Sequence, residues 1–168
     1  TSKDNGKTWS NSILVFEPQE TEEGVIRWGE SCLFLDEEKE CVFHFYNFHL
    51  YPKNIFSGEV QKYTRIFYRI SFDEGKTFSS GKQIIQKGFN ETNWAEDVIY
   101  GKNSIAISFC APLKLNSGKI LLPCQKVPLE HKGDNPFLIS YVAGCFIGEW
   151  KGQEIEWELS QMMKIDPK

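Results

Sequence analysis

The sequence predicts an all-β protein, a β-propeller segment of about three four-stranded antiparallel blades. Two observations support this prediction. An eight-residue motif that suits a tight turn between strands occurs twice, and the segments around its copies alternate apolar and polar residues with period two. No segment has the apolar spacing of a helix over a useful length. A turn motif that repeats with strands between its copies indicates a repeat architecture.

The repeated motif reads Ser-x-Asp-x-Gly-x-Thr-aromatic in both copies. An Asp side chain accepts from backbone N–H groups, a Gly is free to take positive φ, and a Thr hydroxyl is a local partner. The ring after Thr is expected to pack under the turn and anchor it. The defining residues are Ser2, Asp4, Gly6, Thr8 and Trp9 in the first copy and Ser71, Asp73, Gly75, Thr77 and Phe78 in the second.

Strand patterning in the first half of the chain predicts the end of one blade and the whole of the next. An apolar run at residues 12–16, before Pro18, completes a blade over residues 1–17. The next blade, over residues 29–87, begins with an apolar inner strand at 31–35, which suits a strand covered on both faces. Its other strands are predicted at residues 41–48, 65–72 and 82–86, and the second motif copy connects the last two.

The pattern then starts again in a blade over residues 104–165. Its strands are predicted at residues 105–115, 119–127, 137–150 and 155–159. A short turn at residues 151–154, Lys-Gly-Gln-Glu, stands where the motif would be. This blade is therefore expected to keep its hairpin but to lack the motif.

The chain is too short to close a propeller ring, because known propellers have about four to eight blades of about 40–50 residues each. We therefore interpret residues 1–168 as one segment of a larger propeller. Its outermost sheets are expected to have open faces, which the remaining blades cover or through which the chain associates with itself.

The motif resembles the Asp box, or BNR repeat, of the sialidase (neuraminidase) superfamily, where it joins the third and fourth strands of blades in a six-bladed propeller. Residues 111–123, two apolar strands joined by the turn Asn116-Ser117-Gly118, are also similar to the inner hairpin of such blades. The resemblance covers most of the chain as a rhythm of strands, and the two boxes are its specific motifs.

This resemblance implies a glycoside hydrolase with a glycan substrate and no cofactor. Family sialidases use a Tyr nucleophile assisted by a Glu, an Asp acid/base and three arginines that hold the substrate carboxylate, whereas most glycosidases use two carboxylates. The Arg-Ile-Pro signature of the family is absent from this sequence.

The position of the boxes predicts which end of the propeller is functional. Boxes lie in the turn between the third and fourth strands, and the resemblance implies that they face away from the substrate. The loops at the opposite end are then the binding loops of a rigid scaffold. They comprise residues 17–30, 47–64, 87–104 and 126–136.

Residues just before each inner strand are expected to lie nearest the propeller axis. Carboxylates there can act as acid and base, Trp and Tyr faces stack on sugar rings, and Arg binds a carboxylate through two N–H groups. The candidate catalytic residues are Glu30, Glu96 and Asp97. The candidate substrate-binding residues are Arg27, Trp28, Trp94, Tyr100 and His49.

Several of these residue types also have a structural interpretation. A Trp at a blade junction commonly packs as a wedge, and Glu30 or Asp97 could cap the end of a strand. Arg65 and Arg69 share one strand face, which suits a role at a blade edge, and His44 lies in an apolar strand, which suits a core histidine.

Two functions therefore remain open: a sialidase-like hydrolase, and a non-catalytic propeller that binds a glycan or a protein through the same loops. Two carboxyl groups about 5–5.5 Å or 6.5–9.5 Å apart would favour hydrolysis by two carboxylates. Carboxylates that are splayed apart, paired with lysine or located at the box end would disfavour it.

The composition excludes several other functions. The net charge is −4, with three arginines and sixteen lysines, and no basic patch predicts nucleic-acid binding. No apolar run approaches the roughly 20 residues of a membrane helix. His49 and His131 have no second ligand at metal-binding spacing, so no metal site is predicted.

Neither the cysteines nor the one glycosylation sequence motif decides the compartment. Cys32, Cys41, Cys110, Cys124 and Cys145 all lie in apolar runs, so buried thiols are expected rather than metal ligands or disulfides. Free thiols disfavour the extracellular or periplasmic location that the family resemblance implies. Asn90-Glu91-Thr92 is a glycan acceptor only in a secreted eukaryotic protein.

Overall fold

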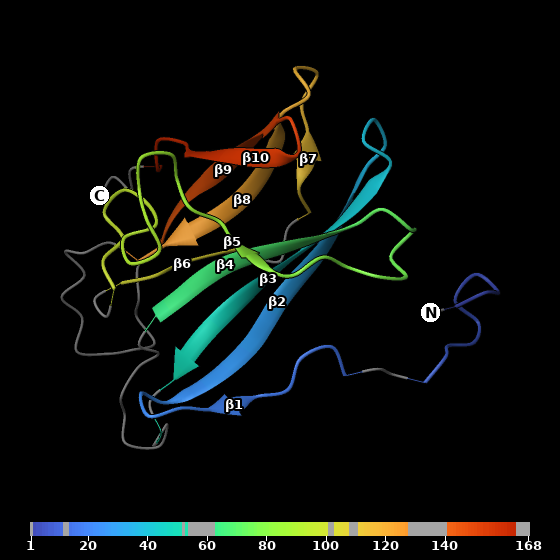
Figure 1. Ribbon diagram of the computed structural model, residues 1–168, viewed down its shortest axis with the longest axis horizontal. Coiled ribbons are helices and arrows are strands. Elements are labelled where there is room, and N and C mark those ends of the chain that lie inside the picture. Colours follow the sequence, from blue (N-terminus) through green and yellow to red (C-terminus); the bar gives the residue numbers. More distant parts are fainter. Residues whose placement is uncertain are drawn as a thin grey trace, which may run out of the picture.

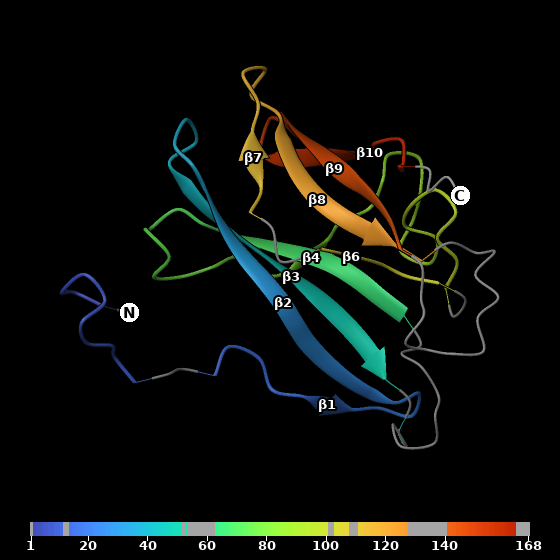
Figure 2. The same ribbon diagram turned by 180° about the vertical axis from the view of Figure 1, so that it is seen from behind.

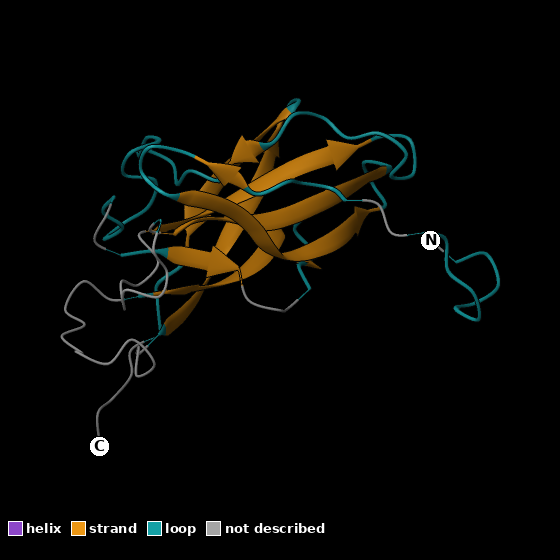
Figure 3. Ribbon diagram, turned by 90° about the horizontal axis from the view of Figure 1, so that it is seen from below, coloured by secondary structure: helices purple, strands orange, loops and turns teal. Residues whose placement is uncertain are grey.

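The computed structural model describes residues 2–11, 14–51, 53, 63–100, 103–107, 111–127 and 141–163. Over these residues the protein is all β and contains no helix, as the sequence predicts (Figure 3). Two curled antiparallel sheets form the body of the molecule (Figures 1 and 2). This architecture is that of a partial β-propeller.

The first sheet has five strands in their order along the chain. They are β1 (Gln19–Glu20), β2 (Val25–Asp36), β3 (Cys41–Tyr51), β4 (Tyr63–Ser71) and β5 (Lys82–Gln83). The register places Arg27 opposite His49, and His49 opposite Thr64 on the next strand. The ladder of β2 and β3 is interrupted once, by a shift between Gly29 and Ser31.

The second sheet has the order β10-β9-β8-β6, and β7 also pairs with β8. Its strands are β6 (Ile105–Ile107), β7 (Leu113–Lys114), β8 (Ile120–Lys126), β9 (Val142–Lys151) and β10 (Glu154–Leu159). The predicted hairpin without the motif is present, since β9 and β10 are joined by a tight turn at Gly152 with φ of 66°.

Three strand predictions differ from the structure. Residues 14–16, part of the first predicted strand, are not in a strand, and residues 12 and 13 lie outside the described residues. Strand β2 begins at Val25, within a predicted loop, because the irregularity after Gly29 lets the ladder continue past it. Strand β5 ends at Gln83, and the amide of Gln86 bonds to the carbonyl of Trp94 instead of to β4.

The predicted long strands of the second sheet are described only in part. The strand predicted at 105–115 corresponds to the separate strands β6 and β7, and residues 108–110 lie outside the described residues. The strand predicted at 137–150 corresponds to β9 from Val142, and residues 137–140 are likewise not described.

The hydrophobic core lies between the two sheets. Alternate residues of β3, including Phe43 and Phe45, are fully buried, as are Ile120 and Leu122 of β8. The ring of Phe45 meets the edge of Trp157 at a centroid distance of 6.0 Å. The period of two in these strands therefore fixes which side chains join the sheets.

The two copies of the repeated motif fold into the same turn. In each copy the Thr amide and hydroxyl donate to the two oxygens of the Asp carboxylate, at 2.9 and 2.6 Å for Asp4 and at 2.8 and 2.6 Å for Asp73. The Gly takes φ of 84° in the first copy and 83° in the second. Bonds from Thr8 and Ser2 lower the pKa of Asp4 to about 2, and the corresponding bonds also lower the pKa of Asp73.

The aromatic residue of each copy packs differently. Each ring lies against its turn, as predicted. A Cβ atom added to Gly6 would lie 3.9 Å from the ring of Trp9, and one added to Gly75 would lie 3.9 Å from the ring of Phe78. Trp9 is nevertheless 73% exposed, whereas Phe78 packs against Arg69, whose guanidinium carbon is 4.5 Å from the ring centroid. Within the described residues, the second turn connects two strands of a sheet, β4 and β5, and the first does not.

The turns of both sheets lie at one end of the molecule (Figure 1). In this view the β2–β3 turn lies at the upper right, the β4–β5 turn, which contains the second motif copy, lies at the right, and the β9–β10 turn lies near the top. The start of β2 and the end of β3 lie at the lower left, and the end of β8 lies at the left. We call the end with these turns the turn end and the opposite end the site end.

Candidate functional site

Glu30 projects from an irregular point at the middle of β2, in the half of the strand that begins at the site end. It lies between Gly29 and Ser31, where the register with β3 shifts, and its φ is 30°, which is uncommon for a residue with a side chain. A bulge of this kind changes the direction of a side chain. Glu30 therefore contacts Asn47 and His49 of β3.

One oxygen of the Glu30 carboxylate is held by two side chains. Oε2 lies 2.6 Å from Nε2 of His49 and accepts a hydrogen bond of 3.0 Å from Nδ2 of Asn47. No described residue bonds to Oε1. The Glu30 side chain is 35% exposed, while that of His49 is only 8% exposed. The Glu30 carboxylate is thus accessible to solvent, while the His49 side chain that holds it is buried.

The partners of Glu30 are themselves bonded further into the protein. The other ring nitrogen of His49, Nδ1, lies 3.0 Å from the hydroxyl of Thr64, a fully buried residue of β4. Asn47 bonds to both backbone groups of Ile107 in the second sheet, at 3.1 Å to the carbonyl and 3.0 Å from the amide. The position of Glu30 therefore depends on both sheets.

Tyr51 and Arg27 lie beside this network. The Tyr51 ring centroid is 5.8 Å from that of His49, and the exposed Arg27 guanidinium is 5.7 Å from the Tyr51 ring. Burial, followed by the charge of Glu30, raises the pKa of Tyr51, and Arg27 opposes this change. At neutral pH the Tyr51 hydroxyl is therefore a proton donor rather than a phenolate.

The two other candidate carboxylates lie on a separate segment. Asp97 has an exposed side chain and is 3.7 Å from Nζ of Lys126, a buried lysine that also donates to the backbone carbonyl of Glu96 at 3.1 Å. The backbone amide of Glu96 donates to Oε1 of Gln86 at 2.7 Å. No contact between described residues joins Glu96 or Asp97 to Glu30.

The candidate aromatic residues have mixed environments. Trp94 is fully buried, with the Arg65 guanidinium 5.3 Å from its ring, so it packs and does not present a face to solvent. Tyr100 is partly exposed, and its hydroxyl donates to Glu23 at 2.6 Å. Arg65 also lies 5.6 Å from the Tyr100 ring, so its guanidinium contacts both aromatic candidates.

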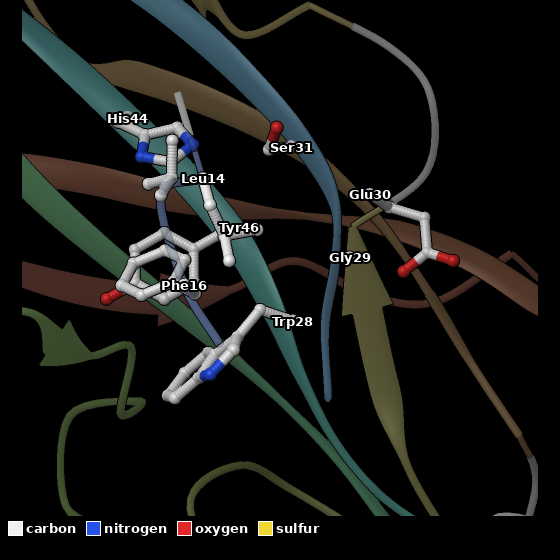
Figure 4. Close-up of a pocket in the computed structure, with 9 residues that line it drawn as sticks. Leu14, Phe16, Trp28, Gly29, Glu30, Ser31, His44 and Tyr46 are labelled. Atoms are coloured by element: carbon white, nitrogen blue, oxygen red, sulfur yellow. The ribbon is translucent and has the colours of Figure 1, made fainter. Parts of the chain in front are cut away.

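Trp28 faces the opposite side of the first sheet from Glu30. Its ring stacks on Phe16 at 4.8 Å and meets the edge of Tyr46 at 5.6 Å. Figure 4 shows these rings around a cavity of about 250 Å³, with the Glu30 carboxyl group pointing away from them. Trp28 thus belongs to an aromatic cluster that covers the outer face of the sheet.

The structure therefore brings Glu30 and His49 into contact, with Arg27 nearby, and leaves the other candidates apart. Sequence reasoning missed Asn47, Thr64 and Tyr51. The signal for two of them was present, because Asn47, His49 and Tyr51 follow each other at the strand period of two and must share one face. Thr64 could be found only from the register of β3 and β4.

The described residues contain no group of three or more His, Cys, Asp or Glu that could hold a metal ion. They also contain no helix long and apolar enough to cross a membrane. Cys41 and Cys124 are buried, and burial raises the pKa of the Cys41 thiol to about 11. Cys110 lies outside the described residues.

No protein-family model matches this sequence, and no curated protein matches it. Among solved structures, the fold is similar to that of Hadza microbial sialidase Hz136, with a TM-score of 0.67 and 13% sequence identity. The match covers 97% of this chain and 30% of that chain, so this chain spans less than a third of the structure that it matches. At this identity the similarity shows the fold, a partial β-propeller resembling that of a sialidase.

Proposed function

We propose that this chain is part of a sialidase-like glycoside hydrolase and that Glu30 is a carboxylate of its active site. The observation that carries the proposal is the asymmetric anchoring of Glu30: two N–H groups hold Oε2, while Oε1 has no bond to a described residue. A fixed carboxylate with one available oxygen can orient a water molecule or take a proton from it. Hydrolysis of a glycosidic bond requires such a group.

The surroundings of Glu30 suit a sugar substrate. Arg27 is exposed beside it and can bind an acidic or hydroxyl-rich ligand, and Tyr51 supplies a neutral hydroxyl. The site end is also opposite the repeated turns, which matches the direction expected from the family resemblance. Under this proposal Glu96 or Asp97 would supply a second carboxylate from the neighbouring loop.

A non-catalytic propeller is the second candidate function. The contact between Asp97 and Lys126 favours it, because a carboxylate close to a lysine is less available as an acid or base. The complete burial of Trp94 also removes one of the expected sugar platforms. In this case Arg27 and Tyr100 would contribute to a surface that binds a glycan or a protein.

The proposal extends to the architecture around the site. We propose that the two repeated turns are Asp boxes, and that the blades extend over residues 1–17, 29–87 and 104–165. The identical bonding of Asp4 and Asp73 supports the first point. Further blades of a six-bladed ring, or a second copy of the chain, would cover the open faces of the two sheets.

The test is turnover of fluorogenic sialosides and other fluorogenic glycosides by the full-length protein. We expect hydrolysis of at least one glycoside and a loss of kcat of about 10²–10⁴-fold in Glu30→Gln, since acid–base groups contribute on this scale. The matched control is Glu38→Gln, which changes a carboxylate that is 73% exposed at the turn end and should leave kcat unchanged.

Two results would decide against the proposal. Full activity in Glu30→Gln would remove Glu30 from the site, even if the protein is a hydrolase. Absence of turnover, together with glycan binding that is lost on Arg27→Ala, would instead establish the non-catalytic function.

A further inference from the structure

We propose that His49 and Thr64 are positioning residues for Glu30, and that His49 does not contact the substrate. In this arrangement the Glu30 carboxylate selects the imidazole tautomer that carries its proton on Nε2, that N–H fixes Oε2 of Glu30, and the Thr64 hydroxyl holds the ring in place by donating to Nδ1. The catalytic consequence rests on the proposed function, whereas the hydrogen-bond arrangement can be tested without any substrate.

The distances define which nitrogen meets which oxygen. Nε2 of His49 is 2.6 Å from Oε2 of Glu30, and Nδ1 is 3.0 Å from Oγ1 of Thr64. An ionised carboxylate only accepts hydrogen bonds, so Nε2 must carry the proton. In a neutral imidazole Nδ1 is then an acceptor, and the Thr64 hydroxyl is the donor that satisfies it.

Burial argues against direct contact with a sugar. His49 is 6% exposed and Thr64 is 1% exposed, whereas the Glu30 side chain is 35% exposed. The register places Arg27 on one side of His49 and Thr64 on the other, within the ladder of three adjacent strands. His49 therefore lies behind Glu30 and acts on a bound substrate through Glu30 alone.

The backbone of Glu30 gives a reason for such support. A non-glycine residue at φ of 30° is held in an unfavourable conformation, which persists only where surrounding contacts enforce it. The donors on Oε2, from His49 and from Asn47, supply this restraint from the side-chain end. Loss of the Thr64 hydroxyl would leave Nδ1 without its donor and the imidazole ring less well fixed, so the N–H of Nε2 would restrain Oε2 less closely.

The first experiment measures the tautomer by long-range ¹H–¹⁵N correlation NMR of the three histidines in the full-length protein. We expect His49 to be protonated on Nε2 in the wild type, to show a changed Nδ1 chemical shift in Thr64→Val, where Nδ1 loses its donor, and to return to the wild-type state in Thr64→Ser. Val has nearly the shape of Thr without the hydroxyl, so the fold should be retained.

His44 is an internal control in the same spectra. Its Nδ1 accepts a hydrogen bond of 2.9 Å from Nε of Arg69 on the other face of the strand, so its tautomer should not respond to Thr64. If His49 is protonated on Nδ1 alone, or if Thr64→Val leaves its signals unchanged, the proposal is wrong. This result does not depend on whether the protein hydrolyses glycosides.

The second experiment is kinetic. With a glycoside that the wild type hydrolyses, we expect Thr64→Val to lower kcat by about 10-fold, the effect of one hydrogen bond, with KM nearly unchanged. Thr64→Ser should restore kcat, and His49→Gln, which keeps an N–H donor, should retain more activity than His49→Leu. A rise in KM with unchanged kcat in His49→Gln would show that His49 binds substrate, contrary to the proposal.

Discussion

The two ends of the sheets hold their polar groups in different ways. At the turn end, the bonds of the second motif copy join residues two or four positions apart, from Ser71 to Asp73 and from Thr77 to Asp73. At the site end, the two partners of Glu30 lie 17 and 19 positions away, and Asn47 bonds to Ile107, 60 positions away. The first arrangement needs only local sequence, whereas the second needs three strands in register and a docked second sheet.

This difference bears on function. A turn that is complete within eight residues keeps its geometry when the surrounding sheet changes, so it suits a scaffold. A carboxylate whose restraints come from two sheets is positioned only in the assembled molecule. Changes that weaken the docking of the sheets should therefore reduce activity at the site end even where no site residue is altered.

Asp36 gives the strongest test of this comparison, because it makes non-local contacts at the turn end. Its fully buried carboxylate is bonded to Nζ of Lys114 and accepts a bond of 3.1 Å from Nε1 of Trp150, and both partners belong to the second sheet. Burial alone would raise the pKa of Asp36, but these donors hold it below its ordinary value. Asp36 thus joins the sheets far from Glu30.

We expect Asp36→Asn to lower the free energy of unfolding by about 3 kcal/mol, because it leaves the largely buried Lys114 ammonium without its closest counter-charge. Urea denaturation measures this loss. The control Glu38→Gln removes the exposed partner of the same lysine and should cost less than about 1 kcal/mol. Similar losses in both variants would mean that the buried contact does not join the sheets.

The second prediction compares the two copies of the turn. Asp73 lies in the connection between β4 and β5, whereas the turn of Asp4 precedes residues that form no strand. We therefore expect Asp73→Ala to lower the thermal unfolding midpoint clearly and Asp4→Ala to leave it nearly unchanged, as measured by circular dichroism. Equal decreases would show that the first turn is also part of the cooperative unit.

The same pair of residues has a defined pH dependence. The bonds from Thr77 and Ser71 lower the pKa of Asp73 below its ordinary value of 3.8. The unfolded chain then binds more protons than the folded one, so the contribution of Asp73 is complete above about pH 3.8 and is lost as the pH falls below it. Asp73→Ala should reduce this acid sensitivity. The pKa of Asp4 is also lowered, but Asp4→Ala should leave the acid sensitivity nearly unchanged, because we expect the first turn to contribute little to the cooperative unfolding of the sheets.

The comparison also explains what could be predicted from the sequence. The turns, the all-β class and the strands β3 and β4 follow from local patterns, since Ser71 to Phe78 contains both the donors and the acceptors of its turn. The sequence does not predict the contact between Glu30 and His49, because this contact depends on the bulge after Gly29. Likewise, the closeness of Trp28 and Glu30 in the sequence predicts that both belong to one site, but their side chains lie on opposite faces of β2 (Figure 4).

The smallest expected effect is a pH dependence of stability that comes from a histidine of β3. This strand carries two histidines, His49 toward the site end and His44 toward the turn end. His49 belongs to the site network, whereas His44 lies on the other face, 6.0 Å from the ring of Phe78 in the second turn. Burial, followed by the charge of Arg69, lowers the pKa of His44 from 6.5 to about 4. The Asp73 carboxylate of this turn is bonded to Ser71 and Thr77.

Between pH 6.5 and pH 4 the unfolded state therefore binds the proton of His44 while the folded state does not. The stability that the neutral His44 contributes is complete above pH 6.5, falls as the pH decreases through this range, and changes no further below about 4. His44→Gln keeps an acceptor for Arg69 but does not titrate. The difference in the free energy of unfolding between wild type and His44→Gln, measured by urea denaturation across this range, should shrink or change sign as the pH falls. Parallel curves would show that His44 is protonated in the folded protein, which would require its ring to be open to water at the turn end.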